Sequence, residues 1–131
     1  QMRLLLDTDI VIDMLRGYPP AMVWFRERPD DITLAISGFS AFELIAGCRN
    51  QVELTRMGQL ISAFEVIWLT PNECSEALNR FRRERLRHGA RMVDTLVAQT
   101  ALSTALPLHT FNSKHFRFIQ ELEINEPYRR L

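Results

Sequence analysis

The chain has 131 residues, with 16 basic and 16 acidic side chains, so its formal net charge at neutral pH is zero. This length fits one domain over residues 1–131, and a 47% share of hydrophobic residues is ordinary for a soluble globular protein. No apolar run approaches the roughly 18 residues of a membrane span, and no signal-peptide pattern precedes the first hydrophobic run. We therefore expect a cytoplasmic protein, whose natural chain starts at Met2 rather than at Gln1.

The first hydrophobic run ends abruptly at an acid. Leu4, Leu5 and Leu6 predict a short strand that is buried on both faces, as in a parallel sheet covered by helices. Asp7 follows at the carboxyl end of this strand, which is the edge where open α/β sheets bind their ligands. Because a lone buried carboxylate is costly, we expect Asp7 to be exposed in a cleft, paired with a base, or bound to a cation.

Helices and strands alternate along the rest of the chain. Hydrophobic spacing predicts helices at 8–16, 19–29, 39–47, 51–64, 71–89 and 92–105. Short β-branched or apolar runs predict strands at 32–36, 66–69 and 107–110, with an edge strand around 122–124. This order predicts an α/β fold, a three-layer α/β/α sandwich around a short parallel sheet of four or five strands.

The zero net charge hides a basic segment in the long helix that follows Pro71. Six arginines crowd this part of the chain: Arg80, Arg82, Arg83, Arg85, Arg87 and Arg91. Arginine makes bidentate contacts with carboxylate or phosphate, so the cluster permits a nucleic-acid partner. A solvated helix face, interrupted only by Glu84, explains it equally well. We expect an apolar stripe on the same helix: Cys74, Ala77, Leu78, Phe81 and Leu86.

Two further features bear on redox state and on partners. Cys48 and Cys74 lack metal-ligand spacing, and we expect them to be buried free thiols. The helix after Pro19 carries more large apolar groups than one buried face absorbs, and we expect an exposed interface there. These groups are Tyr18, Val23, Trp24 and Phe25.

Four polar residues are predicted to converge on one cleft. Asp7 ends the first strand, Glu43 lies in the helix after the second strand, and Asp94 lies early in the last helix. Asn112 follows the fourth strand, and in a parallel sheet all these positions lie along one edge. Each acid also has a simple structural explanation. Ser40 with Glu43 matches a helix capping box, and the other two acids suit helix N-termini.

Three neighbouring carboxylates repel one another unless a divalent cation compensates their charge. Oxygen ligands without Cys or His favour a hard ion such as Mg²⁺ or Mn²⁺ over zinc. Such an ion lowers the pKa of water and neutralises charge on a phosphodiester during in-line displacement. The acids therefore predict phosphodiester hydrolysis, in which nearby arginines position the nucleic-acid backbone.

Four blocks of this sequence resemble those of PIN-domain ribonucleases and, within that group, the VapC toxins of type II toxin–antitoxin systems. The blocks span almost the whole chain in the right order: LDTDIVID at 6–13, SAFELIAG at 40–47, DTLVAQTAL at 94–102 and TFNSKHF at 110–116. The resemblance implies a small α/β/α fold, dependence on Mg²⁺ or Mn²⁺, and endonucleolytic cleavage of RNA. It also implies a homodimer and inhibition by a VapB-type antitoxin, an arginine of which we expect in the acidic cleft.

The resemblance assigns roles to individual residues. Asp7, Glu43 and Asp94 match the three family acids and are the expected metal ligands. Asn112 stands where the family commonly has a fourth Asp, and His115 stands where a further Asp is frequent. This corner of the site is therefore less negative, and the number of metal ions stays open. Asn112 is still expected to contribute its amide oxygen, by holding a metal-bound water.

Neighbouring polar residues have supporting roles in this prediction. We expect Asp9 behind the metal ligands rather than among them, with Thr110 and Ser40 as further supporting residues. Asp13 lies one helical turn beyond Asp9, and we expect it on the helix surface or in a dimer contact.

The three histidines follow no catalytic pattern. We expect His88 and His109 to be structural. His115 lies beside Lys114, and we expect it on a surface loop rather than at a phosphate.

Two other functions compete with the nuclease. Asp7-Thr8-Asp9 also resembles the nucleophile motif of haloacid-dehalogenase-type phosphatases, where Asp7 would be phosphorylated and Asp9 would act as general acid. Against this, the only lysine, Lys114, follows all other motifs, and no late acidic pair is present. The third possibility is a binding module with a degraded site, which Asn112 and His115 indicate and which would bind RNA or a partner without cleavage.

Overall fold

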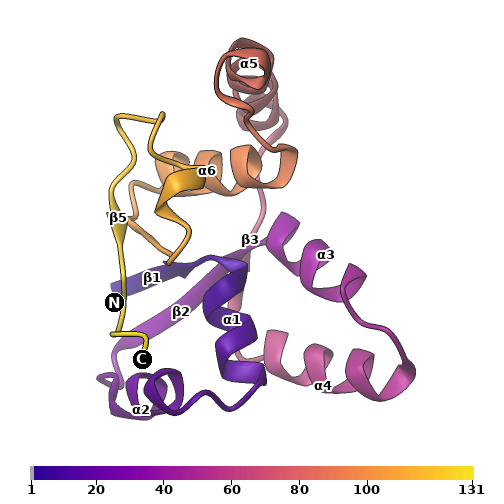
Figure 1. Cartoon of the computed structure of the whole chain (residues 1–131), viewed down its shortest axis with the longest axis vertical. Helices are drawn as coiled ribbons and strands as arrows, with labels where there is room; N and C mark the ends of the chain where they lie inside the picture. The colour runs from indigo at the N-terminus through magenta and orange to yellow at the C-terminus, as the bar shows by residue number, and fades with distance from the viewer. Residues whose placement is uncertain (1) are drawn as a thin grey trace.

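The fold is built on one parallel sheet, seen in the computed structural model, which describes residues 2–131 (Figure 1). The expectation about Gln1 lies outside the described residues. In the order β3-β2-β1-β4-β5, the strands are Glu65–Ile67, Ile32–Ser37, Met2–Leu6, Leu108–His109 and Ile124–Asn125. The helices α1 to α6 are Thr8–Leu15, Pro19–Glu27, Gly38–Ala46, Gln51–Ile61, Pro71–His88 and Met92–Thr104, and a 3-10 turn, η1, spans Ser113–His115.

Side chains along the central strands point alternately to the two faces of the sheet, so the hydrophobic core is divided into two parts. Leu6 of β1 and Ile36 of β2 pack on one side, with residues of α1, α2 and α4. Leu5 and Ala35 pack on the other side, with residues of α6 and of segment 116–122. The period of two along a strand therefore produces two cores, and Figure 1 shows the helices on both sides of the sheet. The predicted α/β/α sandwich is confirmed.

The strand order places the loops that follow β1 and β4 side by side at the carboxyl edge of the sheet, where open α/β sheets bind their ligands. β2 and β3 lie on one side of β1, whereas β4 and β5 lie on the other side. The backbone N–H of Asp7 donates to the carbonyl of His109 at 2.9 Å, so β1 and β4 remain paired up to their carboxyl ends. Asp7 and Asn112 thus follow neighbouring strands at the topological switch point of the sheet.

The outer strands are shorter than the sequence predicted. β3 pairs with β2 only from Glu65 to Ile67, and Trp68 leaves the sheet. The Trp68 ring packs edge-on against Phe39 and Phe42, over Gly38, where any Cβ would collide with it. β4 is two residues long, and β5 begins at Ile124, two residues after Leu122, which is buried in the core.

Helix α5 lies outside α6 and packs mainly against it (Figure 1). It begins with a capping box, in which Thr70 Oγ1 accepts the N–H of Glu73 at 3.2 Å and Glu73 accepts the N–H of Thr70 at 2.8 Å. It ends at Gly89, whose φ of 67° is left-handed. The predicted apolar stripe is wrong at Leu78 and Leu86, which are 56% and 98% exposed, because α6 covers only part of α5.

Tyr128 packs against two of the large apolar residues predicted to be exposed at α2. Tyr18, Trp24 and Phe25 are half-buried, and Val23 is 41% exposed. The ring of Tyr128 lies 6.4 Å from that of Tyr18 and 6.1 Å from that of Trp24, measured between centroids. The prediction of an exposed patch on α2 is therefore wrong for three of its four residues, and the expected partner contact there loses its basis.

Both cysteines, Cys48 and Cys74, are free thiols as predicted, but they are half-buried rather than fully buried. The Cys48 thiol donates to the carbonyl of Leu44 at 3.5 Å, one turn earlier in the chain. Among the described residues, no helix combines the length and the apolar character needed to cross a membrane.

Candidate functional site

A pocket of about 820 Å³ opens at the carboxyl end of the sheet, and residues of α1, α3, α4 and α6 line it. All four residues that the topology predicted to converge contribute to its wall: Asp7, Glu43, Asp94 and Asn112. The predicted convergence is therefore confirmed, while the chemical roles of these residues stay a prediction.

Asp7 is almost fully buried, with 4% of its surface exposed. It caps α1, because Oδ1 accepts the N–H of Thr8 at 2.8 Å, and Oδ2 accepts the hydroxyl of Thr110 at 2.8 Å. Burial and then the charge of Asp9 raise the pKa of Asp7 to about 7, with a smaller contribution from Asp94. The site therefore holds a carboxylate whose charge the protein leaves largely uncompensated.

Asp94 reaches the pocket from the first turn of α6. Within residues 2–131, its Oδ2 is buried and accepts no hydrogen bond. His115 Nδ1 and Arg91 Nε lie 3.5 and 3.8 Å from this oxygen. Burial raises the pKa of Asp94, the charges of His115 and Arg91 oppose this, and the charge of Glu43 adds to it. A buried carboxylate oxygen without a hydrogen-bond donor is available to a cation.

Glu43 lies on the exposed side of α3 at the rim of the pocket. This helix begins at Gly38, where the Ser37 hydroxyl accepts the N–H of Phe39 at 3.2 Å, so Ser40 lies inside the helix. The capping-box explanation of Ser40 and Glu43 is therefore wrong. Ser40 is fully buried and is absent from the pocket lining, and its hydroxyl lacks a partner in the described chain.

Asn112 and His115 complete the pocket on the side of β4. The N–H of Asn112 donates to the Thr110 hydroxyl at 3.0 Å, and this hydroxyl in turn donates to Asp7. The expectation of a surface loop for His115 is wrong, because η1 turns its ring beside Asp94. His115 follows Asn112 by three residues, which is one turn of a 3-10 helix, so this spacing in the sequence is compatible with both side chains facing the pocket.

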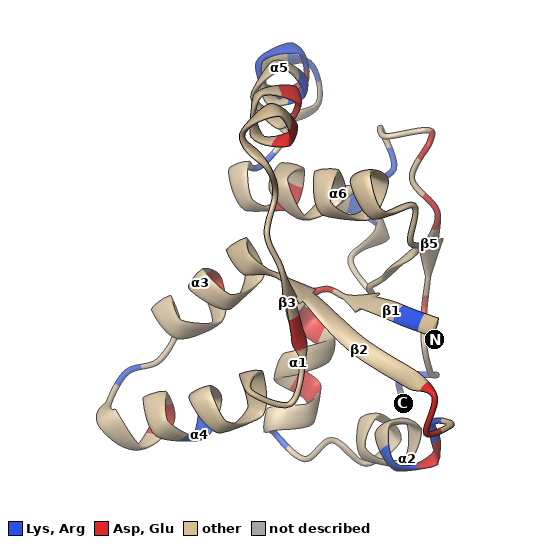
Figure 2. Ribbon diagram, turned by 180° about the vertical axis from the view of Figure 1, so that it is seen from behind, with Lys and Arg blue, Asp and Glu red and all other residues tan. Residues whose placement is uncertain are grey.

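Arginines line the pocket as well, and most of them were not predicted from the sequence. They are Arg16, Arg49, Arg56 and Arg91. Arg49 forms an ion pair with Glu53 at 3.0 Å, and Arg56 donates to the carbonyl of Leu15 at 3.4 Å. Three of these arginines stand singly in the sequence, so no local pattern identifies them. Figure 2 shows the basic stretch of α5 on the far side of α6 from the sheet.

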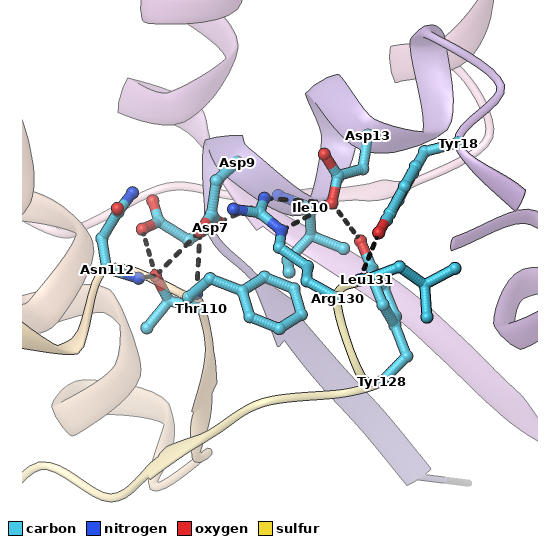
Figure 3. Close-up of polar contacts among 11 residues, drawn as sticks. Asp7, Asp9, Ile10, Asp13, Tyr18, Thr110, Asn112, Tyr128, Arg130 and Leu131 are labelled. Carbon is cyan, nitrogen blue, oxygen red and sulfur yellow. Dashed lines mark hydrogen bonds and ion pairs between the residues drawn. The ribbon is translucent and has the colours of Figure 1, made fainter. Parts of the chain in front are cut away.

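Asp9 is absent from the lining of the pocket and contacts the loop after β4 (Figure 3). Its expected role behind the metal ligands stays a prediction. Its Oδ2 accepts the N–H of Phe111 at 2.7 Å and lies 3.4 Å from Thr110 Oγ1. Burial raises the pKa of Asp9, whereas the hydrogen bond from Phe111 and then the charge of Arg130 lower it. Asp9 therefore connects α1 to the loop that follows β4.

Asp13 does not lie on an open helix surface as predicted, and its alternative role in a dimer contact stays a prediction. Its carboxylate accepts hydrogen bonds from Tyr128 and Arg130 and has 14% of its surface exposed. His88 forms an ion pair with a glutamate one helical turn earlier, at 2.8 Å. His109 is buried in β4, which lowers its pKa, so both histidines lie in structural surroundings as expected.

The donor set of the pocket fits a hard divalent cation. Asp7 and Asp94 offer buried carboxylate oxygens, and burial raises the pKa of each because it disfavours the charged form. In the part of the chain that is described, no three acidic, histidine or cysteine side chains come close enough to enclose an ion alone. Because Mg²⁺ binds through one or two carboxylates and retains several waters, these two acids would hold it, with Glu43 at the rim.

Comparison with known proteins gives consistent matches over nearly the whole chain. Residues 4–121 match the model of the PIN domain family. The chain is 34% identical over 123 residues to Ribonuclease VapC10 of Mycobacterium tuberculosis, covering 92% of this chain and 90% of that relative. It is 37% identical over 123 residues to Ribonuclease VapC19 of the same organism, covering 91% and 96%. A solved toxin–antitoxin complex from Klebsiella pneumoniae has the same fold, with a TM-score of 0.74 at 24% identity and coverage of 97% and 99%.

Proposed function

Because the chain belongs to the PIN domain family, in its VapC branch, we propose that it is an endoribonuclease that depends on Mg²⁺ or Mn²⁺ and acts as a toxin of a toxin–antitoxin pair. The observation that supports this most directly is the single pocket that Asp7, Glu43 and Asp94 line from three separate parts of the fold. Both similar proteins from M. tuberculosis are named ribonucleases, which supports the nuclease class.

Two acids of the pocket, Asp7 and Asp94, have surroundings in the fold that suit cation binding. The N–H of Thr8 and the hydroxyl of Thr110 each hold one oxygen of Asp7, so the orientation of this carboxylate is fixed. Asp94 presents an oxygen without a hydrogen-bond partner in the described residues. A divalent cation bound here would lower the pKa of a water molecule and neutralise charge on the RNA phosphate.

The positive side chains of the pocket support a nucleic-acid substrate. Arg91 and His115 flank Asp94, where they can contact the oxygens of the phosphate that is cleaved. Arg16 and Arg56 lie further along the same pocket and can contact neighbouring phosphates of the strand. A pocket with acids beside arginines fits a nucleic-acid strand. The arginines would contact several of its phosphates, and cleavage would occur at one of them.

An antitoxin of the VapB type is the proposed protein partner. The Klebsiella neighbour is titled a toxin–antitoxin complex, which supports such a partner for a chain of this fold. An arginine of the antitoxin that enters the pocket between Asp7 and Asp94 would replace the charge of the cation. The homodimer that the family resemblance implies stays a prediction.

A binding module without cleavage is the second candidate, because Asn112 and His115 replace acids at one corner of the pocket. In that case the arginines would still bind RNA, but the remaining acids would not hold an ion. The phosphatase alternative is not retained. Asp9, its general acid, accepts a hydrogen bond from Phe111 behind the pocket instead of facing a substrate.

Cleavage of RNA by the purified chain tests the proposed function. We expect the wild type to cut a mixed-sequence RNA with Mg²⁺ or Mn²⁺ and to be inactive in EDTA. Asp7→Asn and Asp94→Asn should each lower the rate by roughly 100-fold while circular dichroism stays unchanged. Full activity in both variants would contradict the assignment. RNA binding without Mn²⁺ binding in calorimetry would favour the second candidate.

A further inference from the structure

Segment 128–131 returns to the sheet edge and contacts α1 (Figure 3). The Tyr128 hydroxyl donates to Asp13 Oδ2 at 2.6 Å. Arg130 donates to the same oxygen from Nη2 at 3.0 Å and from Nε at 3.2 Å. Three donors therefore meet one carboxylate oxygen, and two of them belong to a charged guanidinium.

The same two side chains also hold the loop that follows β4. The Arg130 guanidinium lies 4.2 Å from the centroid of the Phe111 ring, and the Tyr128 ring lies 5.0 Å from it. A guanidinium over an aromatic ring is an attractive contact. Phe111 therefore packs against both Tyr128 and Arg130, while its N–H donates to Asp9 of α1.

The neighbours of Phe111 belong to the candidate site. Thr110 orients Asp7 through its hydroxyl, and the N–H of Asn112 donates to that same hydroxyl. Asp7 is itself the N-cap of α1, the helix to which Tyr128 and Arg130 bind. Segment 128–131 thus connects the two elements that carry pocket residues at the switch point of the sheet.

We propose that Tyr128 and Arg130 are positioning residues for the pocket: by binding Asp13 and packing on Phe111, they fix loop 110–112 relative to α1 and so fix Asp7. Neither side chain lines the pocket, so neither is expected to contact RNA. The proposal rests on the proposed function, because its consequence is a change in cation affinity and turnover.

Substitutions of the two residues test the proposal, with the exposed neighbour Arg129 as the matched control. Arg130→Ala should weaken Mn²⁺ binding in calorimetry about tenfold and lower kcat on RNA about tenfold, with KM within about twofold. Tyr128→Phe keeps the ring on Phe111 and removes one donor, so a loss of about threefold is expected. Arg130→Lys keeps the charge at Asp13 and should recover most of the activity. Arg129→Ala should match the wild type.

Amide hydrogen exchange gives a readout that does not depend on nuclease activity. Arg130→Ala should speed exchange at the N–H groups of Phe111 and Asn112 about tenfold and leave the amides of β2 unchanged. Unchanged exchange there, or Mn²⁺ affinity and kcat equal to wild type in both Arg130→Ala and Tyr128→Phe, would overturn the positioning role. Equal losses in Arg129→Ala would also overturn it. Faster exchange in a chain whose wild type neither binds Mn²⁺ nor cuts RNA would instead count against the proposed function. If Arg130→Ala fails to fold, Tyr128→Phe, which lacks a single oxygen atom, carries the same comparison.

Discussion

The acidic pocket and the arginine-rich face of α5 differ in how the chain builds them. The pocket collects Asp7, Glu43 and Asp94 from distant parts of the sequence, and burial raises the pKa of Asp7 to about 7. The arginines of α5 follow one another, and most are exposed to solvent. The exception is Arg80, which forms an ion pair with Glu121 at 3.1 Å. Charges that are costly to bury indicate a functional site more strongly than charges that are merely numerous.

Helix α5 contributes to the pocket indirectly. It packs mainly on α6, which carries Asp94, and Glu76 of α5 accepts a hydrogen bond from Gln99 of α6 at 3.1 Å. We therefore expect the chemistry to take place in the pocket and α5 to support the pocket through α6. Four measurements can test this division of roles.

The largest difference is expected between a rim acid of the pocket and the exposed arginines of α5. Glu43→Gln removes negative charge where the cation is expected, so RNA cleavage should fall between about 10-fold and 100-fold. The double variant Arg83→Ala and Arg87→Ala should keep its rate within about twofold. Initial cleavage rates at fixed Mn²⁺ measure both variants. A similar loss in the two would remove the distinction between these regions.

The free energy of unfolding of the metal-free protein should show how much the buried charge of Asp7 destabilises the fold. The pKa of Asp7 is about 7 in the fold and 3.8 ordinarily, so the folded state binds the proton more tightly. The stability that the fold gains by binding this proton is fully present below about pH 4 and is lost as the pH rises through 7. Asp7→Asn should therefore raise the free energy of unfolding by about 2 kcal/mol at pH 8 and change it little at pH 4. Urea unfolding in EDTA measures this, and a variant less stable than wild type at pH 8 would refute it.

Salt dependence separates the two groups of arginines. The double variant Arg16→Ala and Arg56→Ala should raise KM for RNA about tenfold at low salt. It should also reduce the slope of log affinity against log salt by about 1.4, as expected for two lost phosphate contacts on a single strand. The double variant Arg83→Ala and Arg87→Ala is the matched control with the same charge change. An equal change of slope in both would mean that RNA also follows α5.

The smallest effect concerns the start of α5. Thr70→Ala removes the side-chain oxygen that accepts the N–H of Glu73, so the free energy of unfolding should fall by about 1 kcal/mol. The cleavage rate of the folded variant should stay at the wild-type value. A changed rate at equal folded fraction would show that α5 does more than support α6.

Local patterns in the sequence were sufficient for much of the fold and for the composition of the acidic pocket. Periodicity identified every helix and the central strands, since the spacing of apolar residues reflects one helix face or one strand face. The convergence of Asp7 and Asn112 followed from the prediction of a parallel sheet, because parallel strands end at one edge of the sheet. Boundaries were misplaced in the short outer strands, where two or three pairings decide the length, and at helix ends such as that of α4, which ends at Ile61 rather than at residue 64.

Only the tertiary structure decided whether each remaining residue is exposed or buried. Leu86 is solvent-exposed because α6 is too short to cover all of α5, and Trp24 is half-buried because Tyr128 packs on it. The partners of Asp13 lie 115 and 117 residues away in the chain. Sequence spacing determines what lies one turn or one strand position away, whereas contacts over such separations depend on how the finished elements pack.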